Sequence, residues 1–332
     1  CTSIWGNSSP STPYTANKAG KGPAWSNSLF EDNAEFGYGM LLAQQAIRDG
    51  LKAKVEEVAA NENATAEVKA ACQEWLDTFG VGATNGAATD KLVAALENVD
   101  CPTCKDIVKN KDFLAKKSQW IFGGDGWAYD IGFNGVDHVL ASGKDINIMV
   151  FNTEVYSNTG GQSSKATPTG AVAQFAAGGK EVKQKDLAAI AMSYGYVYVA
   201  QISMGADMNQ TIKAIAEAEA YPGPSLIIAY APCINHGIKK GMAKAQTEEK
   251  LAVQSGYWNL FRFNPAAEGK KFSLDCKPAT VDYQEFIKGE VRYTSLALKN
   301  PARAEKLFAK AEQNAKDKYA YLEKLVTLYD EK

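Results

Sequence analysis

Short apolar runs alternate with amphipathic stretches through the middle of the chain. Four runs rich in β-branched or aromatic residues predict buried strands, at residues 120–122, 146–151, 196–202 and 225–230. Stretches with helical spacing lie between them, at residues 130–142, 186–194 and 207–219. Asp130 is expected to open the first of these helices and Gly143 to close it. This alternation predicts an α/β fold with a doubly wound, mostly parallel sheet.

The pattern before this core is helical. Apolar residues recur at helical spacing from Asn33, and Gly50 is a plausible end for that helix. Residues 52–118 read as several helices separated by polar breaks, one of them capped by Asn63 or Thr65. The sequence therefore predicts a peripheral helical insertion at 52–118.

The pattern weakens after the last predicted core strand. We expect strands at Tyr257–Phe263 and Arg292–Leu298, and an amphipathic helix at Pro301–Leu328. Residues 243–332 are accordingly interpreted as a C-terminal extension that packs on the core.

Composition and charge narrow the class of protein. The 332 residues carry 36 Lys and Arg against 38 Asp and Glu, a net charge of −2. This balance does not indicate binding to nucleic acid or to an anionic membrane, because both select clustered basic residues. The uncharged stretch between Asp186 and Asp207 changes character at Gly195, so it reads as helix, turn and strand, not as a membrane span.

The cysteines and the first residue bear on the setting of the protein. Six cysteines in a chain of this length are too sparse for a disulfide scaffold, which favours a reduced, intracellular setting. The sequence begins at Cys1 without an initiator methionine, so we expect it to be part of a longer polypeptide.

Two polar segments follow two of the predicted strands. Gly124-Asp125-Gly126 comes directly after the first core strand, and Asn152-Thr153 follows the next. In a strand-helix-strand unit both strand ends reach one edge of the sheet, where glycines permit close approach to a ligand. Asp125, Thr153 and a backbone carbonyl could then bind one octahedral Mg²⁺, whose remaining ligands come from phosphate and water. The sequence therefore predicts a diphosphate–magnesium site.

Longer motifs around these residues carry a family resemblance. The chain resembles the pyruvate:ferredoxin (flavodoxin) oxidoreductases in Gly-Asp-Gly-Trp-Ala-Tyr-Asp-Ile-Gly (124–132), Asn-Thr-Glu-Val-Tyr-Ser-Asn-Thr-Gly-Gly-Gln (152–162), Gly-Pro-Ala-Trp-Ser-Asn-Ser-Leu-Phe-Glu-Asp-Asn-Ala-Glu-Phe (22–36), Cys-Thr-Ser-Ile-Trp-Gly (1–6) and Ala-Pro-Cys-Ile-Asn-His-Gly (231–237). The resemblance is good over residues 1–240 and looser beyond. It implies that residues 1–332 are the thiamine-diphosphate-binding domain of a longer polypeptide.

The resemblance assigns roles to individual residues. It implies Mg²⁺ bound by Asp125, Thr153 and the carbonyl of Val155, and an Asn158 amide that contacts the substrate. The residues expected to bind the cofactor are Gly124, Asp125, Gly126, Trp127, Asn152, Thr153, Val155 and Tyr156. Ser157 and Gln162 are weaker candidates for the same loop. The general thiamine motif ends in Asn-Asn, whereas Thr153 supplies a hydroxyl, which is still a reasonable hard ligand.

The resemblance also implies iron. Cys1 and Cys233 match two ligands of a 4Fe–4S cluster, whose other two cysteines would precede Cys1. By contrast, Cys101-Pro-Thr-Cys104 lies in the helical insertion and does not match the cluster spacing, so it is interpreted as a surface dithiol or an adventitious disulfide. His138 is expected to be structural, and His236 to help pack the cluster loop.

The activity implied is oxidative decarboxylation of pyruvate with coenzyme A, giving acetyl-CoA and carbon dioxide. Electrons would pass through 4Fe–4S clusters to ferredoxin or flavodoxin, in a cytoplasmic homodimer that includes the remaining domains of the polypeptide. Three alternatives stay open: an oxidoreductase for another 2-oxoacid, a thiamine-dependent decarboxylase without clusters, and a non-catalytic assembly module.

Overall fold

The computed structural model describes residues 31–330. Contacts divide the chain into two compact units, which within this range comprise residues 31–36 with 120–330, and residues 37–119. Among residues 31–330, none of the helices combines the length and the apolar character that crossing a bilayer requires.

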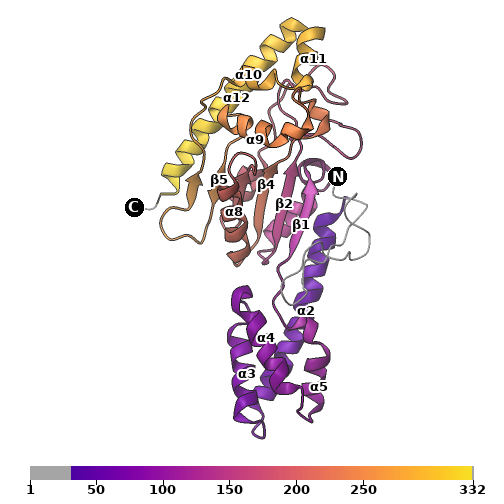
Figure 1. The fold of residues 1–332 in the computed structure, drawn as a ribbon, viewed down its shortest axis with the longest axis vertical. Coiled ribbons are helices and arrows are strands. Elements are labelled where there is room, and N and C mark those ends of the chain that lie inside the picture. The colour runs from indigo at the N-terminus through magenta and orange to yellow at the C-terminus, as the bar shows by residue number, and fades with distance from the viewer. Residues whose placement is uncertain (1–30, 331–332) are drawn as a thin grey trace. The chain divides into compact units, whose positions relative to one another are not determined.

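The larger unit is built on one six-stranded sheet in the order β1-β2-β4-β3-β5-β6 (Figure 1). The strands are β1 (Trp120–Gly124), β2 (Asn147–Asn152), β3 (Tyr198–Ile202), β4 (Ser225–Tyr230), β5 (Phe261–Phe263) and β6 (Phe272–Leu274). The first four are parallel, and β5 and β6 extend the sheet in antiparallel fashion beyond β3. The predicted mostly parallel α/β fold is confirmed.

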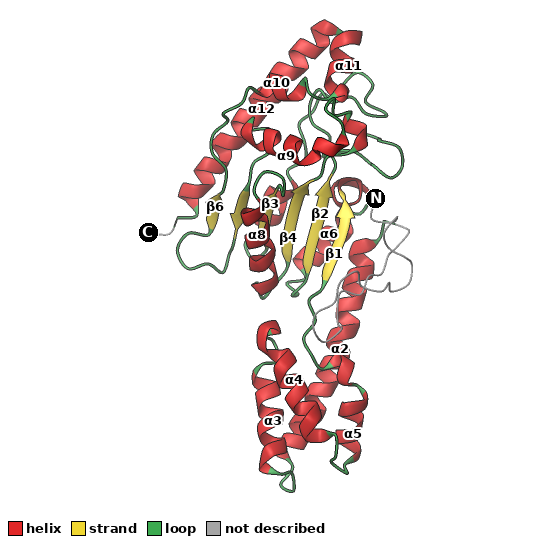
Figure 2. Cartoon of the chain, viewed as in Figure 1, coloured by secondary structure: helices red, strands yellow, loops and turns green. Residues whose placement is uncertain are grey.

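Helices cover the sheet and its end (Figure 2). They are the π-helical turn η2 (Gly126–Ile131), the 3₁₀ turns η3 (Ile234–His236) and η4 (Met242–Lys244), and the α-helices α6 (Phe133–Ala141), α7 (Leu187–Met192), α8 (Met208–Ala220), α9 (Ala245–Gln254), α10 (Tyr283–Ile287), α11 (Val291–Lys299) and α12 (Pro301–Leu328). The steps β1 to β2 and β3 to β4 run in opposite directions across the sheet. Since such crossovers are right-handed, α6 and α8 cover opposite faces, as in a doubly wound sheet.

The sheet interior is apolar on both faces. Under α8, Ala214 and Ala218 pack in one buried cluster with side chains of the strands, among them Tyr198 and Ile227. At alternate positions of β2, Ile148 and Val150 are also fully buried. Such continuous burial is typical of a parallel sheet with helices on both faces.

The smaller unit is helical. Its helices are α2 (Asn33–Ala60), which starts four residues before the unit, α3 (Ala66–Asp77), α4 (Gly82–Leu96), α5 (Pro102–Lys109) and the 3₁₀ turn η1 (Lys111–Phe113). Thr65 caps α3, because its side chain accepts from the Val68 N–H at 3.3 Å. The apolar core of this unit includes the fully buried Trp75. Its indole N–H donates to the Thr89 hydroxyl at 3.2 Å.

Four expectations about elements were wrong in detail. Gly50 does not end α2, which continues to Ala60. A glycine inside a helix costs about 1 kcal/mol. Burial of Leu51 and Val55, which follow Gly50, offsets this cost. Asp130 opens no helix. Its side chain instead accepts from the Lys165 N–H and pairs with Lys165 Nζ at 2.6 Å, while α6 begins three residues later.

The other two errors lie in the C-terminal extension. Arg292–Leu298 is not a strand but part of α11, whose buried face includes a charged residue, Arg292, that the hydrophobic pattern counts as exposed. The strand predicted at Tyr257–Phe263 is limited to β5, since Trp258 turns into the core and donates its indole N–H to the Ile202 carbonyl.

Candidate functional site

The strand ends bring the predicted magnesium ligands together. Asp125 follows β1 and Thr153 follows β2, and these parallel neighbours pair in register up to Gly124 opposite Phe151. The Thr153 N–H and hydroxyl both donate to Asp125 Oδ1, at 2.9 Å and 2.8 Å. The same hydroxyl lies 3.0 Å from the Val155 carbonyl oxygen. We call Asp125 Oδ1, Thr153 Oγ1 and Val155 O the clamp.

The clamp fits a small divalent cation. Neighbouring ligand oxygens of an octahedral Mg²⁺, each about 2.05 Å from the ion, lie about 2.9 Å apart. The Asp125–Thr153 and Thr153–Val155 oxygens have separations of 2.8 and 3.0 Å. A carboxylate, a hydroxyl and a carbonyl are also hard donors of the kind that Mg²⁺ prefers. The donor chemistry of the three atoms and these two separations therefore fit Mg²⁺.

Burial makes the Asp125 carboxyl an unusual group. The residue is fully buried, and this burial raises its pKa to about 6. Hydrogen bonds from Ser164 and Thr153 act in the opposite direction. Such a carboxylate gains most from a cation beside it, because a nearby positive charge replaces the lost solvation.

Ser164 is a site residue that the sequence did not reveal. Its hydroxyl donates to Asp125 Oδ2 at 2.6 Å, and its oxygen accepts from the Ala166 N–H at 3.1 Å. Ser164 thereby occupies the second carboxylate oxygen and leaves Oδ1 to face the clamp. It lies in the long loop between β2 and α7, where no periodic pattern could have singled it out.

The glycines around Asp125 have different surroundings. A Cβ at Gly126 would meet the ring of Tyr156 at 2.4 Å, so Gly126 and Tyr156 are in tight contact. A Cβ at Gly123 would similarly meet the buried Trp127 at 2.2 Å. At Gly124, no atom of the described residues lies within 4 Å of an added Cβ. As far as residues 31–330 are concerned, Gly124 is therefore the glycine of the motif with open space where a side chain would begin.

This difference predicts that one small substitution lowers the affinity for the cofactor and that another lowers the stability of the fold. Gly124→Ala is expected to leave the free energy of unfolding within about 0.5 kcal/mol of wild type, but to weaken thiamine diphosphate binding about tenfold, because the methyl group occupies ligand space. Gly126→Ala is expected to cost about 1–3 kcal/mol, because the Tyr156 ring must move. Urea unfolding and calorimetric titration measure both; an unchanged affinity in Gly124→Ala would remove this glycine from the site.

The loop after β2 carries the remaining predicted contacts. Asn152 is buried, accepts from the Glu154 N–H at 3.2 Å, and lies 3.5 Å from the Tyr129 hydroxyl. Tyr156 exchanges backbone hydrogen bonds with Gln162 and Gly161, which closes residues 156–162 into a compact loop. Asn158 is an exposed residue of this loop. The structure thus groups Tyr156 with the clamp and leaves Asn158 at the surface of the unit.

Cys233 lies beside this loop. It is buried in the segment after β4, the strand next to β2, and the Asn235 amide approaches its sulfur at 3.5 Å. The same Asn235 side chain packs against Gly161, where a Cβ would meet it at 2.8 Å. Cys1, the second predicted cluster ligand of this chain, lies outside the described residues. Within residues 31–330, no three His, Cys, Asp or Glu side chains are grouped to hold a metal.

His236 joins the Cys233 segment to the clamp. Its Nε2 lies 2.7 Å from the Thr153 carbonyl oxygen, and the ring is fully buried. Burial and the Arg292 charge keep its pKa well below the ordinary value, so the ring is neutral and donates from Nε2. His236 therefore holds the Thr153 backbone in place without adding a charge.

A buried ion network holds Glu154, the residue between two clamp residues. Glu154, between Thr153 and Val155, adopts a left-handed φ of 60° and is fully buried. Its Oε2 accepts from Arg292 Nη2 at 2.7 Å and from the Tyr257 hydroxyl at 2.6 Å. Arg292 Nε also donates to Glu290 at 2.7 Å. Holding a non-glycine residue in this conformation costs about 1–3 kcal/mol, which this network offsets.

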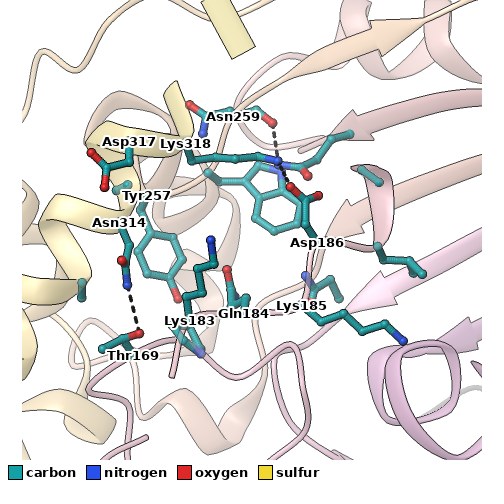
Figure 3. A pocket seen from close by; sticks show the side chains of 18 of the residues that line it. Thr169, Lys183, Gln184, Lys185, Asp186, Tyr257, Asn259, Asn314, Asp317 and Lys318 are labelled. Carbon is teal, nitrogen blue, oxygen red and sulfur yellow. Dashed lines mark hydrogen bonds and ion pairs between the residues drawn. The ribbon is translucent and has the colours of Figure 1, made fainter. Parts of the chain in front are cut away.

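A cavity of about 420 Å³ adjoins that network (Figure 3). It lies at the carboxyl end of the sheet, between Asn152 and Gln201 of the strands and residues such as Asn314 and Lys318 of α12. Lys318 pairs there with Asp186, and Asn314 donates to Thr169 at 3.2 Å. The clamp residues Asp125, Thr153 and Val155 do not line it, so this cavity and the clamp are distinct.

The fold is a mostly parallel α/β sheet that carries the clamp at the ends of β1 and β2. Residues 108–229 match the family model "Thiamine pyrophosphate enzyme, C-terminal TPP binding domain". This range contains β1 to β3, all of β4 except its last residue, and the whole clamp.

Individual relatives make the similarity more specific. The chain is 53% identical over 330 residues to the pyruvate-flavodoxin oxidoreductase of Klebsiella pneumoniae, and 55% identical over 335 residues to the pyruvate:ferredoxin oxidoreductase of Moorella thermoacetica. Each match covers 98% of this chain but 28% of the relative. A mitochondrial pyruvate dehydrogenase [NADP(+)] of Euglena gracilis is 47% identical, over 95% of this chain and 18% of its own. Over nearly its whole length the chain is therefore similar to one part of these oxidoreductases, and it spans less than a third of these relatives' length.

Proposed function

We propose that this chain binds the diphosphate of thiamine diphosphate through Mg²⁺ in a pyruvate oxidoreductase. The observation that carries the proposal is the clamp, three hard oxygens separated by 2.8 and 3.0 Å at the end of β1 and β2. The similarity to the pyruvate oxidoreductases supports the same cofactor and the same 2-oxoacid.

The chain's own residues would position the cofactor. When bound, thiamine diphosphate supplies the carbanion-stabilising chemistry that releases carbon dioxide from a 2-oxoacid. Asp125, Thr153 and the Val155 carbonyl would hold Mg²⁺ against the diphosphate, and Gly124 leaves room for it. Tyr156 packs over Gly126 beside the clamp, which suits a contact with the cofactor. Asn158, an exposed residue of the loop at 156–162, would contact pyruvate.

Cys233 would supply one thiolate to a 4Fe–4S cluster. Its segment contacts the clamp loop through Asn235 and His236, so a cluster there would lie close to the cofactor. Cys1 and two further cysteines would complete it. Coenzyme A would accept the acetyl group in a cytoplasmic homodimer that uses the remaining domains of the polypeptide. Ferredoxin or flavodoxin would accept the electrons, as the names of two relatives indicate.

Binding and turnover of the 332-residue chain test this proposal separately. Calorimetry is expected to show Mg²⁺-dependent binding of thiamine diphosphate, abolished by EDTA, because the clamp requires the ion. With pyruvate added, we expect no sustained release of carbon dioxide, because the chain spans 28% of these relatives. Binding that is unchanged by EDTA contradicts the clamp, and robust turnover contradicts the need for further domains.

Iron is tested on the complete polypeptide that carries this sequence. Anaerobic purification followed by iron analysis and electron paramagnetic resonance is expected to show one 4Fe–4S cluster fewer in Cys233→Ser. Cys276→Ser is the matched control, because Cys276 is a partly buried free thiol that contacts Asn259 and Leu260. Equal iron in both variants excludes Cys233 as a ligand.

A further inference from the structure

We propose that Cys101 and Cys104 form a thiol–disulfide exchange centre that reacts with low-molecular-weight disulfides. The two residues belong to Cys101-Pro102-Thr103-Cys104, which opens α5 in the helical unit. Neither the clamp nor the cluster uses them, so this inference is independent of the proposed thiamine function.

Cys101 has the surroundings of an attacking thiolate. It is the N-cap of α5, with φ −137° and ψ 129°, and its sulfur accepts from the Cys104 N–H at 3.4 Å. Pro102 occupies the first turn, where its missing N–H costs nothing. The hydrogen bonds from Cys104 and Thr103 lower the pKa of Cys101, and its side chain is partly exposed. A helix N-terminus favours a thiolate in this way.

Cys104 has the opposite surroundings. It is 2% exposed and belongs to the apolar core of the helical unit, together with Cys72, Trp75 and Ile107. Burial, followed by the sulfur and the charge of Cys101, raises the pKa of Cys104 to about 12. An external disulfide cannot readily reach such a thiol. Cys101 can reach it, because it lies three residues away on the same helical turn. Two of the causes that raise this pKa come from Cys101 and disappear once Cys101 is in a mixed disulfide.

This asymmetry defines a balanced two-step exchange. The Cys101 thiolate attacks one sulfur of a disulfide RSSR, forms a Cys101–SR bond and releases RS⁻, which takes a proton from solvent. Cys104 then loses its proton, attacks Cys101 Sγ and releases the second RS⁻. The pair loses two electrons and becomes a disulfide, while RSSR is reduced to two RSH. A metal-site interpretation has no support here, because within residues 31–330 no group of three or more His, Cys, Asp or Glu can hold a metal.

Two single substitutions separate the roles. In the 332-residue chain, Cys104→Ser is expected to accumulate a stable glutathione adduct on Cys101, because no second thiol resolves it. Cys101→Ser is expected to react with oxidised glutathione at least about tenfold more slowly, because the remaining thiol of the pair is buried. Serine is a good N-cap, so this variant keeps the start of α5 and should fold. Cys276→Ser serves as the control and should behave as wild type.

The experiment incubates the folded protein with defined ratios of reduced to oxidised glutathione, quenches with acid, alkylates and maps the peptides by mass spectrometry. Wild type is expected to give an intramolecular Cys101–Cys104 disulfide that forms and disappears reversibly with the ratio. Circular dichroism checks the fold of each variant. A failure of the disulfide to form at any ratio overturns the proposal, as does an equal reaction rate in Cys101→Ser and wild type.

Discussion

Replacing Asp125 by asparagine is expected to lower the Mg²⁺-dependent affinity for thiamine diphosphate at least about a hundredfold, ~2.7 kcal/mol. Asp125 is the single anionic group of the clamp, and the other two ligands are a hydroxyl and a carbonyl. Asparagine keeps the shape and can still accept from the Thr153 N–H. Calorimetric titration at fixed Mg²⁺ measures the loss, which isolates the charge from the packing.

The same substitution is expected to stabilise the protein when no metal is present. Burial raises the pKa of Asp125 from 3.8 to about 6. At pH 7, above both values, the carboxyl is ionised in the folded and the unfolded chain, so the whole shift acts against folding. Removing the charge should therefore raise the free energy of unfolding in EDTA by about 1–3 kcal/mol. Binding and stability thus change in opposite directions, as expected when a site is built for its ligand.

Asp130→Asn is the matched control. Asp130 is also an aspartate near the clamp, but it pairs with Lys165, whose side chain is 61% exposed. Its replacement should change affinity and stability little, because partly exposed pairs contribute about 0–1 kcal/mol. If Asp125→Asn binds thiamine diphosphate as wild type does, the clamp is not the site. If it is less stable than wild type in EDTA, the carboxylate is not strained in the empty site.

The sequence could predict the clamp because a local rule fixes it. Asp125 and Thr153 each follow a strand, and neighbouring parallel strands end at one edge of the sheet. Two apolar runs and one connecting helix therefore suffice to bring the two residues together. The same rule places Cys233 after β4, next to β2.

Residues that reach the clamp from elsewhere follow no such rule. Ser164 lies 39 positions from Asp125 in an irregular loop, and Arg292 lies 138 positions from Glu154. Arg292 also misled the strand prediction, because a pattern of apolar positions cannot show that a charge is buried. A buried ion pair joins two positions through tertiary structure alone, so only the structure could reveal it.

Arg292 binds both glutamates of the buried ion network, Glu154 and Glu290. It is buried between Glu154 and Glu290, and its guanidinium donates to both. Burial alone would lower the pKa of Arg292, but the two glutamates hold it well above the ordinary value. Burial likewise raises the pKa of Glu290 to about 7, against the opposing charge of Arg292. The arginine is thus the positive charge on which two buried carboxyls depend.

Arg292→Met is therefore expected to lower the free energy of unfolding by about 3–5 kcal/mol, because it leaves buried carboxylates without a cationic partner. Urea denaturation at pH 7 measures the loss. Arg303→Met is the control, since Arg303 pairs with Glu181 at the surface and should contribute less than about 1 kcal/mol. Thiamine diphosphate binding should also weaken in Arg292→Met, because Glu154 lies between two clamp residues.

A double substitution decides whether the charge or the packing is responsible. If the unpaired carboxylate causes the loss, Glu154→Gln in the Arg292→Met background should recover about 1–3 kcal/mol, as interacting pairs do in double-mutant cycles. Glutamine keeps one acceptor oxygen for the Tyr257 hydroxyl while removing the charge. An additive double variant would mean that Arg292 stabilises the unit by packing of its side chain. A loss below about 1 kcal/mol in Arg292→Met would show that the buried network does not hold the clamp loop.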